Sequence, residues 1–314
     1  MPSSARAARH SNPEPEPVRC STEVHSRMGT GMIFTLATLL VGGSAVSSAS
    51  SAGLATVSAP ATFRADTPAV RLTLAQAKAR LAAGTDETPP DLSQTDLSGL
   101  DLSGLDFKRA NLTGSRLAGT KLAGANLFTS DLTDAILTDA DLQKANMDGT
   151  VLRRANLQRA NLTGASLFAT IIESADLSGA QLSNTRIIGY LRAAKLRGAN
   201  LRNANIGADP GNQSMGVMRA TFVGADLTGA DFSGANLFKA DFSHANLTQA
   251  RLTGADLRNA ELIQTDLSGA DLTGAKLAKA NIDGAIFSGI SGRNQIVGLD
   301  QTRNTDKAIF DVSR

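Results

Sequence analysis

The 314-residue chain carries 31 Lys and Arg against 29 Asp and Glu, so its formal net charge is only +2. Aromatic residues make up 4% of the chain, with no Trp and a single Tyr, which is sparse for the core of an ordinary globular domain. A single Cys excludes an internal disulfide, and three His residues, two of them within the first 25 positions, are too few for a zinc site or a catalytic triad.

The first 66 residues predict an exported protein. Residues 1–31 are polar and Pro-rich, as in a disordered or misassigned N-terminal extension, and Met28 offers an alternative translation start. Residues 32–52 hold a 15-residue apolar run followed by small residues, the layout of a signal peptide cleaved near residue 50. The run is short for a membrane span of about 20 residues, and a weak anchor or a buried segment are the alternatives. Residues 53–66 are expected to form a linker.

Residues 67–84 predict a short amphipathic helix. Its apolar positions recur at helical spacing, at Leu74, Ala75, Leu81 and Ala82. Gly84 follows, where glycine commonly ends a helix. We expect this helix to cover the first coil of the repeats that begin at residue 91, because an open end would expose unpaired strand edges.

From residue 91 to 287 a large apolar residue recurs every five positions, as in GADLTGADFSGANLFKADFSHANLTQARLTGADL, which ends at Leu257. A helix turns about 100° per residue, so a five-residue step places successive apolar residues on different faces. A strand alternates faces with every residue, so an odd step sends them to opposite sides of a sheet. The period therefore predicts a solenoid that turns a corner at each repeat and fills its own axis.

The register of the repeat breaks twice. Twenty repeats keep one phase from Leu92 to Ile187, and fourteen more keep it from Phe222 to Phe287. Four repeats between these blocks are shifted by one residue, with central residues Leu191, Leu196, Leu201 and Ile206. Sixteen residues then separate the last of them from the next block, which predicts an inserted loop at 207–219.

The units ANLTG, ADLSG, ADLTG and ADFSG resemble the pentapeptide repeat family, whose unit is A(D/N)LXX. The resemblance implies an all-β fold, a right-handed quadrilateral β-helix in which four pentapeptides form one coil. The 38 repeats would then make between nine and ten coils. At a strand spacing of about 4.8 Å they would form a rod roughly 45 Å long.

Each position of the unit has an expected role in such a coil. The central Leu or Phe and the Ala two residues earlier point inward, and Gly in the last position suits a turn with positive φ. The Asp or Asn before the central residue points outward. Stacked in successive coils, these polar side chains are expected to form hydrogen-bonded ladders.

One column of outward positions is unusually apolar. With four repeats per coil, the residues after the central position stack so that one face carries an interrupted stripe of Phe128, Phe168, Ile188 and Phe238. An exposed apolar stripe is typical of a partner-binding face. The alternative is that the column packs against neighbouring long side chains or the loop at 207–219. Polar and apolar residues of that loop are candidate binding residues, namely Asp209, Asn212, Gln213 and Met215.

Residues 288–314 lose the five-residue register, although KAIFD, around Ala308 and Phe310, resembles one last repeat. We expect this segment to close the C-terminal end of the rod.

The sequence offers no catalytic, cofactor or metal motif, since its regular carboxylates belong to the repeat. Residues 91–287 hold 18 Asp and 2 Glu against 19 Lys and Arg, a charge of −1, so nucleic acid is not an expected partner. We interpret the chain as an exported, periplasmic or secreted, non-enzymatic scaffold of the bacterial envelope. It would bind an unknown protein or self-associate, and touch a membrane only through an uncleaved signal. The alternative is a cytosolic protein that protects gyrase by mimicking DNA, the best-known activity of the family.

Overall fold

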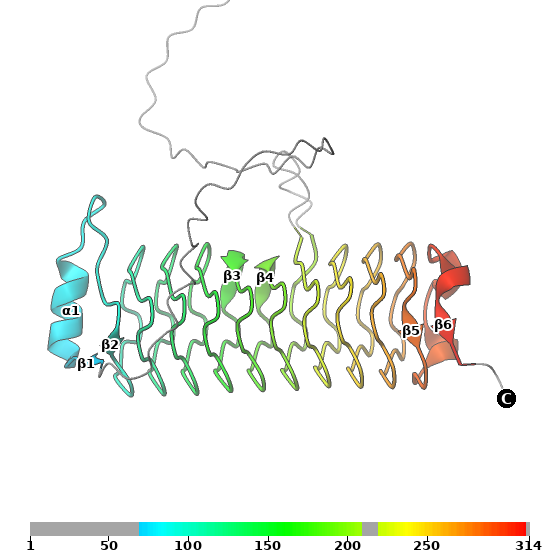
Figure 1. Cartoon of the computed structure of the whole chain (residues 1–314), viewed down its shortest axis with the longest axis horizontal. Coiled ribbons are helices and arrows are strands. Elements are labelled where there is room, and N and C mark those ends of the chain that lie inside the picture. Colours follow the sequence, from blue (N-terminus) through cyan, green and yellow to red (C-terminus); the bar gives the residue numbers. More distant parts are fainter. Residues whose placement is uncertain (1–68, 209–218, 312–314) are drawn as a thin grey trace, which may run out of the picture. The chain divides into compact units, whose positions relative to one another are not determined.

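The computed structural model describes residues 69–208 and 219–311 (Figure 1). The chain divides into two units, Met1–Phe63 and Arg64–Arg314, and every described residue belongs to the second. The predicted extension, signal peptide and linker lie outside the described residues. So do the four candidate loop residues, Asp209, Asn212, Gln213 and Met215.

Regular elements are short in the described part. Its one α-helix is α1 (Leu74–Ala82). The strands are β1 (Val70–Arg71), β2 (Thr95–Asp96), β3 (Ser166–Ile171), β4 (Arg186–Tyr190), β5 (Ile286–Phe287) and β6 (Ile309–Phe310). Three 3-10 helices follow β5, namely η2 (Arg293–Gln295), η3 (Leu299–Gln301) and η4 (Thr305–Lys307). The strands pair in parallel as β1–β2, β3–β4 and β5–β6.

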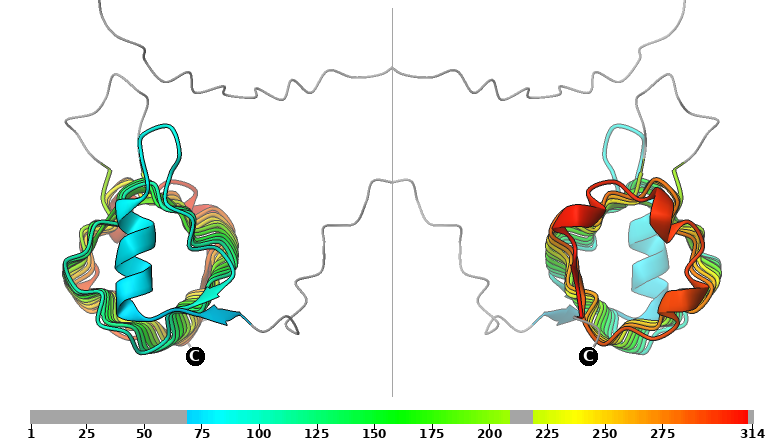
Figure 2. Two further views of the ribbon diagram at one scale, coloured as in Figure 1. Left: turned by 90° about the vertical axis from the view of Figure 1, so that its left-hand side faces the viewer. Right: turned by 90° about the vertical axis from the view of Figure 1, so that its right-hand side faces the viewer.

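Parallel bridges between residues twenty positions apart hold the coils together. Asp106 pairs with Asn126, and Asn126 pairs with Asn146, each residue lying just before a central apolar residue. The N–H of the next residue donates to the following coil, as from Phe107 to the carbonyl oxygen of Asn126 at 2.7 Å. Since each repeat has five residues, twenty residues make four sides, and the views along the axis show this four-sided outline (Figure 2). The predicted quadrilateral β-helix is confirmed.

The lumen of the coil is filled by the two inward positions of the repeat. The central residues from Leu92 to Phe287 and the Ala residues two positions earlier are all at most 2% exposed. Where Thr replaces Ala, its hydroxyl is also buried and donates to a backbone carbonyl oxygen, as Thr120 does to Leu97 at 3.0 Å. The burial pattern follows the repeat position rather than the residue type.

The corners and ladders also follow the predicted roles. The last position of the repeat has positive φ, 71° at Gly99 and 66° at Gly229, which glycine adopts without strain. The amide of Asn126 donates to the carboxylate of Asp106 at 2.8 Å and accepts from the amide of Asn146 at 3.1 Å. The expected ladder of polar side chains is therefore present on this side of the coil.

The one-residue shift in the register is absorbed at a single corner. In the β3–β4 pair Phe168 lies opposite Ile188 and Thr170 lies opposite Gly189, so Ala169 has no partner. The second coil thus turns this corner with one residue fewer. A Cβ atom on Gly189 would lie 2.3 Å from the carbonyl oxygen of Thr170, so the shortened corner requires glycine.

Helix α1 lies across the first coil (Figure 2, left). Thr73 begins it with a capping box, accepting from the N–H of Gln76 while the Gln76 side chain accepts from the N–H of Thr73. Leu74 and Leu81 pack against the core, and Ala77 is fully buried. The other two predicted apolar positions, Ala75 and Ala82, are exposed.

The segment after Phe287 adds one further coil with longer sides. Ser291, Val297 and Arg303 pair with the preceding coil at six-residue intervals, and Phe310 of β6 stacks on Phe287 of β5 at 4.9 Å. A left-handed residue opens each 3-10 corner, at Gly292, Gly298 and Asn304. The five-residue period lapses here because each corner holds one more residue, and the coil itself continues.

Candidate binding groove

The predicted column of Phe128, Phe168, Ile188 and Phe238 is a true stack, because the ladder from Asp106 to Asn236 places these positions above one another. It is not a continuous exposed stripe. Phe128 is 39% exposed, whereas Phe168 and Phe238 are half-buried and Ile188 is only 2% exposed. The prediction for Ile188 was wrong. Its corner has one residue fewer than that of the preceding coil, where Ala169 follows Phe168.

Cationic side chains cover two of the rings. The guanidinium carbon of Arg186 lies 4.4 Å from the ring centroid of Phe168. At Phe238 the ammonium of Lys239 lies 5.3 Å and the guanidinium carbon of Arg258 6.0 Å from the centroid. The sequence left open the alternative that the column packs against neighbouring long side chains. The rings of Phe168 and Phe238 do pack in this way. A partner-binding role for Phe128 and Phe238 stays a prediction.

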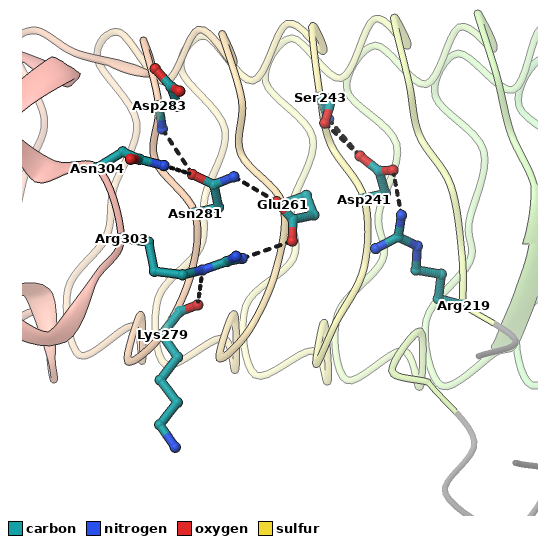
Figure 3. Close-up of polar contacts among 9 residues, drawn as sticks. All are labelled: Arg219, Asp241, Ser243, Glu261, Lys279, Asn281, Asp283, Arg303 and Asn304. Carbon is teal, nitrogen blue, oxygen red and sulfur yellow. Dashed lines mark hydrogen bonds and ion pairs between the residues drawn. The ribbon is translucent and has the colours of Figure 1, made fainter. Parts of the chain in front are cut away.

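The corner next to Phe238 opens into a groove of about 430 Å³. Its lining side chains are Arg219, Lys239, Asn259, Glu261, Lys279 and Arg303, and we call this feature the corner groove. Most of its polar contacts are visible in Figure 3. The inserted loop leaves and rejoins the coil at the same place, since Ala208 donates its N–H to the carbonyl oxygen of Phe238 at 2.8 Å and Arg219 lines the groove.

One row of the corner groove comes from the repeat itself. Lys239, Asn259 and Lys279 occupy the last position of the same side in three successive coils, with φ of 61°, 58° and 63°. Their N–H groups donate to the following coil at 3.1 Å each, which fixes the backbone from which the side chains project. Successive coils are about 4.8 Å apart, so the two lysines start about 9.6 Å from each other.

The opposite row is held by ion pairs. Arg219 donates to the carboxylate of Asp241 at 3.0 Å, and Arg303 donates to that of Glu261 at 2.7 Å (Figure 3). Arg303 also donates to the backbone oxygen of Lys279 at 3.2 Å. The second oxygen of Glu261 accepts from the Asn281 amide at 2.9 Å. Both carboxylates are thus engaged, and the two arginines are fixed in direction.

Two cations at the groove have no such partner. Among the described residues, neither the ammonium of Lys239 nor that of Lys279 forms an ion pair, and Figure 3 shows Lys279 extending away from the Glu261 network. Four cations and one carboxylate line the groove, so it is electropositive on a rod whose repeats are close to neutral. Such a site attracts negatively charged groups.

Arg258 borders the same corner and is fixed by Asp256. Its guanidinium donates to both carboxylate oxygens, at 2.8 and 2.6 Å. The hydrogen bond from Arg258 is the main reason that the pKa of Asp256 is lowered from its ordinary value, and the reciprocal bond raises the pKa of Arg258. Arg258 is therefore a fixed cation on the rim beside Phe238.

Within residues 69–208 and 219–311, no group of three or more His, Cys, Asp or Glu side chains is placed to hold a metal ion. The one described histidine, His244, is exposed at a corner with φ of 60°. Over the same ranges no helix has the length and apolarity to cross a membrane. The site that the described structure offers is a charged surface groove.

Sequence reasoning missed the corner groove. Lys239 and Lys279 are forty residues apart, Arg219 was assigned to the loop, and Arg303 lay beyond the recognised repeats. The stacking rule that aligns the Phe column also aligns the last positions of the repeats. Applied to those positions, it places Lys239 and Lys279 in one row. Only the structure places Arg303 in the groove, because the last coil has six-residue sides that the five-residue period does not predict.

The fold and this groove define a solenoid of five-residue repeats with a charged groove on its surface. The sequence model of the family described as pentapeptide repeats matches at residues 91–127, 130–167, 152–188, 218–254 and 250–289, together more than half of the chain. The chain belongs to the pentapeptide repeat family, whose members fold as right-handed quadrilateral β-helices. No catalytic family is indicated, and no curated protein sequence matches.

Several solved structures are similar. One is HetL, a pentapeptide repeat protein involved in heterocyst differentiation regulation in the cyanobacterium Nostoc sp. strain PCC 7120, with 29% identity and a TM-score of 0.61 over 76% of this chain and 99% of HetL. A thylakoid-lumen protein of Arabidopsis thaliana has 28% identity and a TM-score of 0.25, covering 43% of this chain and 81% of its own. QnrB1, a plasmid-mediated fluoroquinolone resistance protein, has 16% identity and a TM-score of 0.27, covering 69% and 93%.

Proposed function

We propose that this chain is a non-enzymatic scaffold that binds a protein partner at the corner formed by Phe238 and the corner groove, where the chain enters and leaves the loop at Ala208 and Arg219. The observation that carries the proposal is the groove itself. Four cations and one carboxylate line it, and neither Lys239 nor Lys279 forms an ion pair among the described residues. Pentapeptide repeat proteins generally serve as structural or binding scaffolds, which supports this role.

The binding face is tested by replacing the exposed ring of Phe128 and the half-buried ring of Phe238 together, as Phe128→Ser with Phe238→Ser. The partner is first captured from envelope extracts by the wild-type protein and identified, and its binding is then measured with purified components. We expect the double variant to lose binding while its thermal unfolding changes little, because both rings lie outside the lumen. Ile309→Ser is the matched control, since Ile309 is 52% exposed and pairs with Ile286, in the ladder on the side of the coil opposite Asn236 and Phe238. Undiminished binding by the double variant would refute this face.

We also propose that the protein acts outside the cytoplasm, on the strength of the apolar run and small residues at 32–52. Fractionation of cells that express the full chain, followed by N-terminal sequencing, tests the proposal. A mature form that begins near residue 50 in the periplasm or medium is expected. An intact cytosolic chain would contradict export, and inhibition of gyrase supercoiling would then be the next measurement.

A further part of the proposal is that α1 caps the coil. The full burial of Ala77 and the packing of Leu74 and Leu81 on the core support this role. Repeat proteins need such a terminal cover, because an end coil has a neighbour on only one side.

A further inference from the structure

We propose that the corner groove binds an acidic segment of the partner in an extended polyproline II conformation, with carboxylates three residues apart. This inference rests on the proposed scaffold function and names the chemistry that one of its sites recognises. It is carried by the charges, the spacing and the hydrogen-bonding groups of the groove.

The charges of the groove lining indicate that the ligand is negatively charged. Arg219 and Arg303 are neutralised by Asp241 and Glu261, at 3.0 and 2.7 Å. Lys239 and Lys279 are the remaining cations of the lining and have no carboxylate within ion-pairing distance in the described structure. Two positive charges are therefore available to a ligand. A lysine that gains a carboxylate here forms a charge-assisted hydrogen bond without breaking an existing ion pair.

The spacing sets the conformation of the ligand. Lys239 and Lys279 share one corner position two coils apart, so their backbones are separated by about 9.6 Å. A polyproline II chain has three residues per turn and rises about 3.1 Å per residue, so every third side chain lies on one side at intervals of about 9.3 Å. A β-strand at about 3.3 Å per residue places side chains three apart on opposite faces. The polyproline II interval of about 9.3 Å therefore matches the backbone separation of the two lysines, whereas side chains on one face of a β-strand lie about 6.6 or 13 Å apart.

A neutral group lies between the two lysines. Asn259 lines the groove in the intervening coil, and no hydrogen bond of its side-chain amide is found in the described structure. An amide can donate to a backbone carbonyl, and polyproline II chains leave their backbone groups without internal hydrogen bonds. Phe238 borders the same row, and its ring packs against the ammonium of Lys239 at 5.3 Å.

The same features disfavour a nucleic acid. The repeat region carries a charge of −1, so no extended positive field surrounds the rod. Glu261 and Asp241 neutralise two of the four lining cations, which leaves too little positive charge for a run of closely spaced phosphates. The unpaired positive charge of the groove lining comes from two lysines. This arrangement suits a short ligand with two carboxylates.

The test is titration calorimetry of the purified protein, in the form in which it accumulates, with a synthetic peptide of four Glu-Pro-Pro triplets at low ionic strength. We expect one-site binding that weakens as salt is added, because the contacts are ionic and near the surface. A control peptide with four Glu at every second position has no pair three residues apart, and we expect its affinity to be several times lower.

Variants locate the site. Lys239→Gln and Lys279→Gln each remove one charge and are expected to weaken peptide binding about tenfold, the loss of one charge-assisted contact. Lys144→Gln is the matched control, because Lys144 has the same corner position and positive φ, 54°, on a different side of the coil. Its affinity for the peptide should equal that of the wild type.

Three results would overturn the proposal. They are no peptide binding at millimolar concentration, an equal loss of affinity in Lys144→Gln, and tighter binding of a twelve-nucleotide oligothymidylate than of the triplet peptide. Equal affinity for the two peptides would overturn the polyproline II register. If the peptide does not bind but the captured partner still depends on Phe128 and Phe238, the groove assignment alone fails. If that dependence is also absent, the proposed function fails with it.

Discussion

The rings of Phe222 and Phe242 stack face to face inside the coil, with centroids 4.9 Å apart and planes inclined by 10°. They occupy the same side of two successive coils. Phe232, on another side, meets both edge-on at 6.3 and 6.0 Å. All three are fully buried, so these coils carry rings where most other coils carry Leu. Offset and edge-to-face contacts stabilise such clusters beyond the apolar area that they bury.

Phe242→Ala should remove the centre of this cluster and destabilise the protein by about 3–5 kcal/mol, because the stacked coils cannot collapse into the cavity. Phe242→Leu is the control and should cost less than about 1.5 kcal/mol, since Leu fills the same position in most other coils. Urea unfolding compares the two, with hydrogen exchange to detect partial unfolding. A loss in Phe242→Leu as large as that in Phe242→Ala would contradict this expectation and show that an aliphatic side chain cannot replace the ring.

Gly189→Ala should be disruptive at the shortened corner. Its Cβ would lie 2.3 Å from the carbonyl oxygen of Thr170, and that oxygen belongs to the backbone and cannot rotate away. We expect a loss of about 1–3 kcal/mol in thermal or urea unfolding. Gly124→Asn is the control, because nothing lies within 4 Å of a Cβ there and Asn tolerates a positive φ. A Gly189→Ala protein as stable as this control would contradict the glycine requirement.

Ser115→Ala should stabilise the protein. The Ser115 hydroxyl is fully buried and has no hydrogen-bond partner, whereas Ala fills this repeat position in most coils. Removal of an unsatisfied buried hydroxyl is expected to raise the free energy of unfolding by about 1 kcal/mol. Thr120→Val removes a hydroxyl that does donate, to the Leu97 carbonyl oxygen at 3.0 Å, and should lower stability instead. Changes of the same sign in the two variants would refute this distinction.

Acid should weaken the fold through its paired carboxylates. The hydroxyl of Thr273 donates to Asp271 at 2.6 Å and is the main reason that the pKa of Asp271 is lowered, as the pKa values of Asp96 and Asp256 also are. A folded-state pKa below the unfolded value, about 3.9, gives stability that is present above that pH and lost as the pH falls through the folded pKa.

Asp271→Asn should therefore be less stable than the wild type at neutral pH, and the gap should close as the pH falls below about 4. Urea midpoints measured between neutral and strongly acidic pH check this. A gap that persists unchanged in acid would mean that Asp271 contributes through shape and not through its charge.

Ala77→Asp should open the N-terminal end of the coil, because it places an unpaired carboxylate between α1 and the core. Hydrogen exchange should accelerate at the N–H groups of Leu92 and Leu97, which bond to the next coil, and stay slow at Leu257. Ala79→Asp is the control on the exposed side of the same helix. Unchanged exchange in the Ala77→Asp protein would refute the capping role of α1.

The five-residue period determined most of the fold. A central apolar residue and an Ala at fixed spacing can be buried together only if the chain turns at every repeat, so the lumen, the corners and the polar ladder of Asp106, Asn126 and Asn146 could be predicted from the sequence. The interruptions could be located for the same reason. The way in which the chain absorbs these interruptions could not be predicted, because the shortened corner at Gly189 depends on backbone contact between two coils.

The candidate site was decided by tertiary structure. The sequence placed Ile188 on an exposed stripe, but a missing corner residue buries it, and cations cover Phe168 and Phe238. It gave no sign that Arg303 reaches Glu261 across 42 residues, because the last coil changes to six-residue sides. The period by itself determined which residues face inward, since burial follows from periodicity. Which outward side chains pair, and which lysines stay unpaired, depends on the stacking of coils and was decided only in three dimensions.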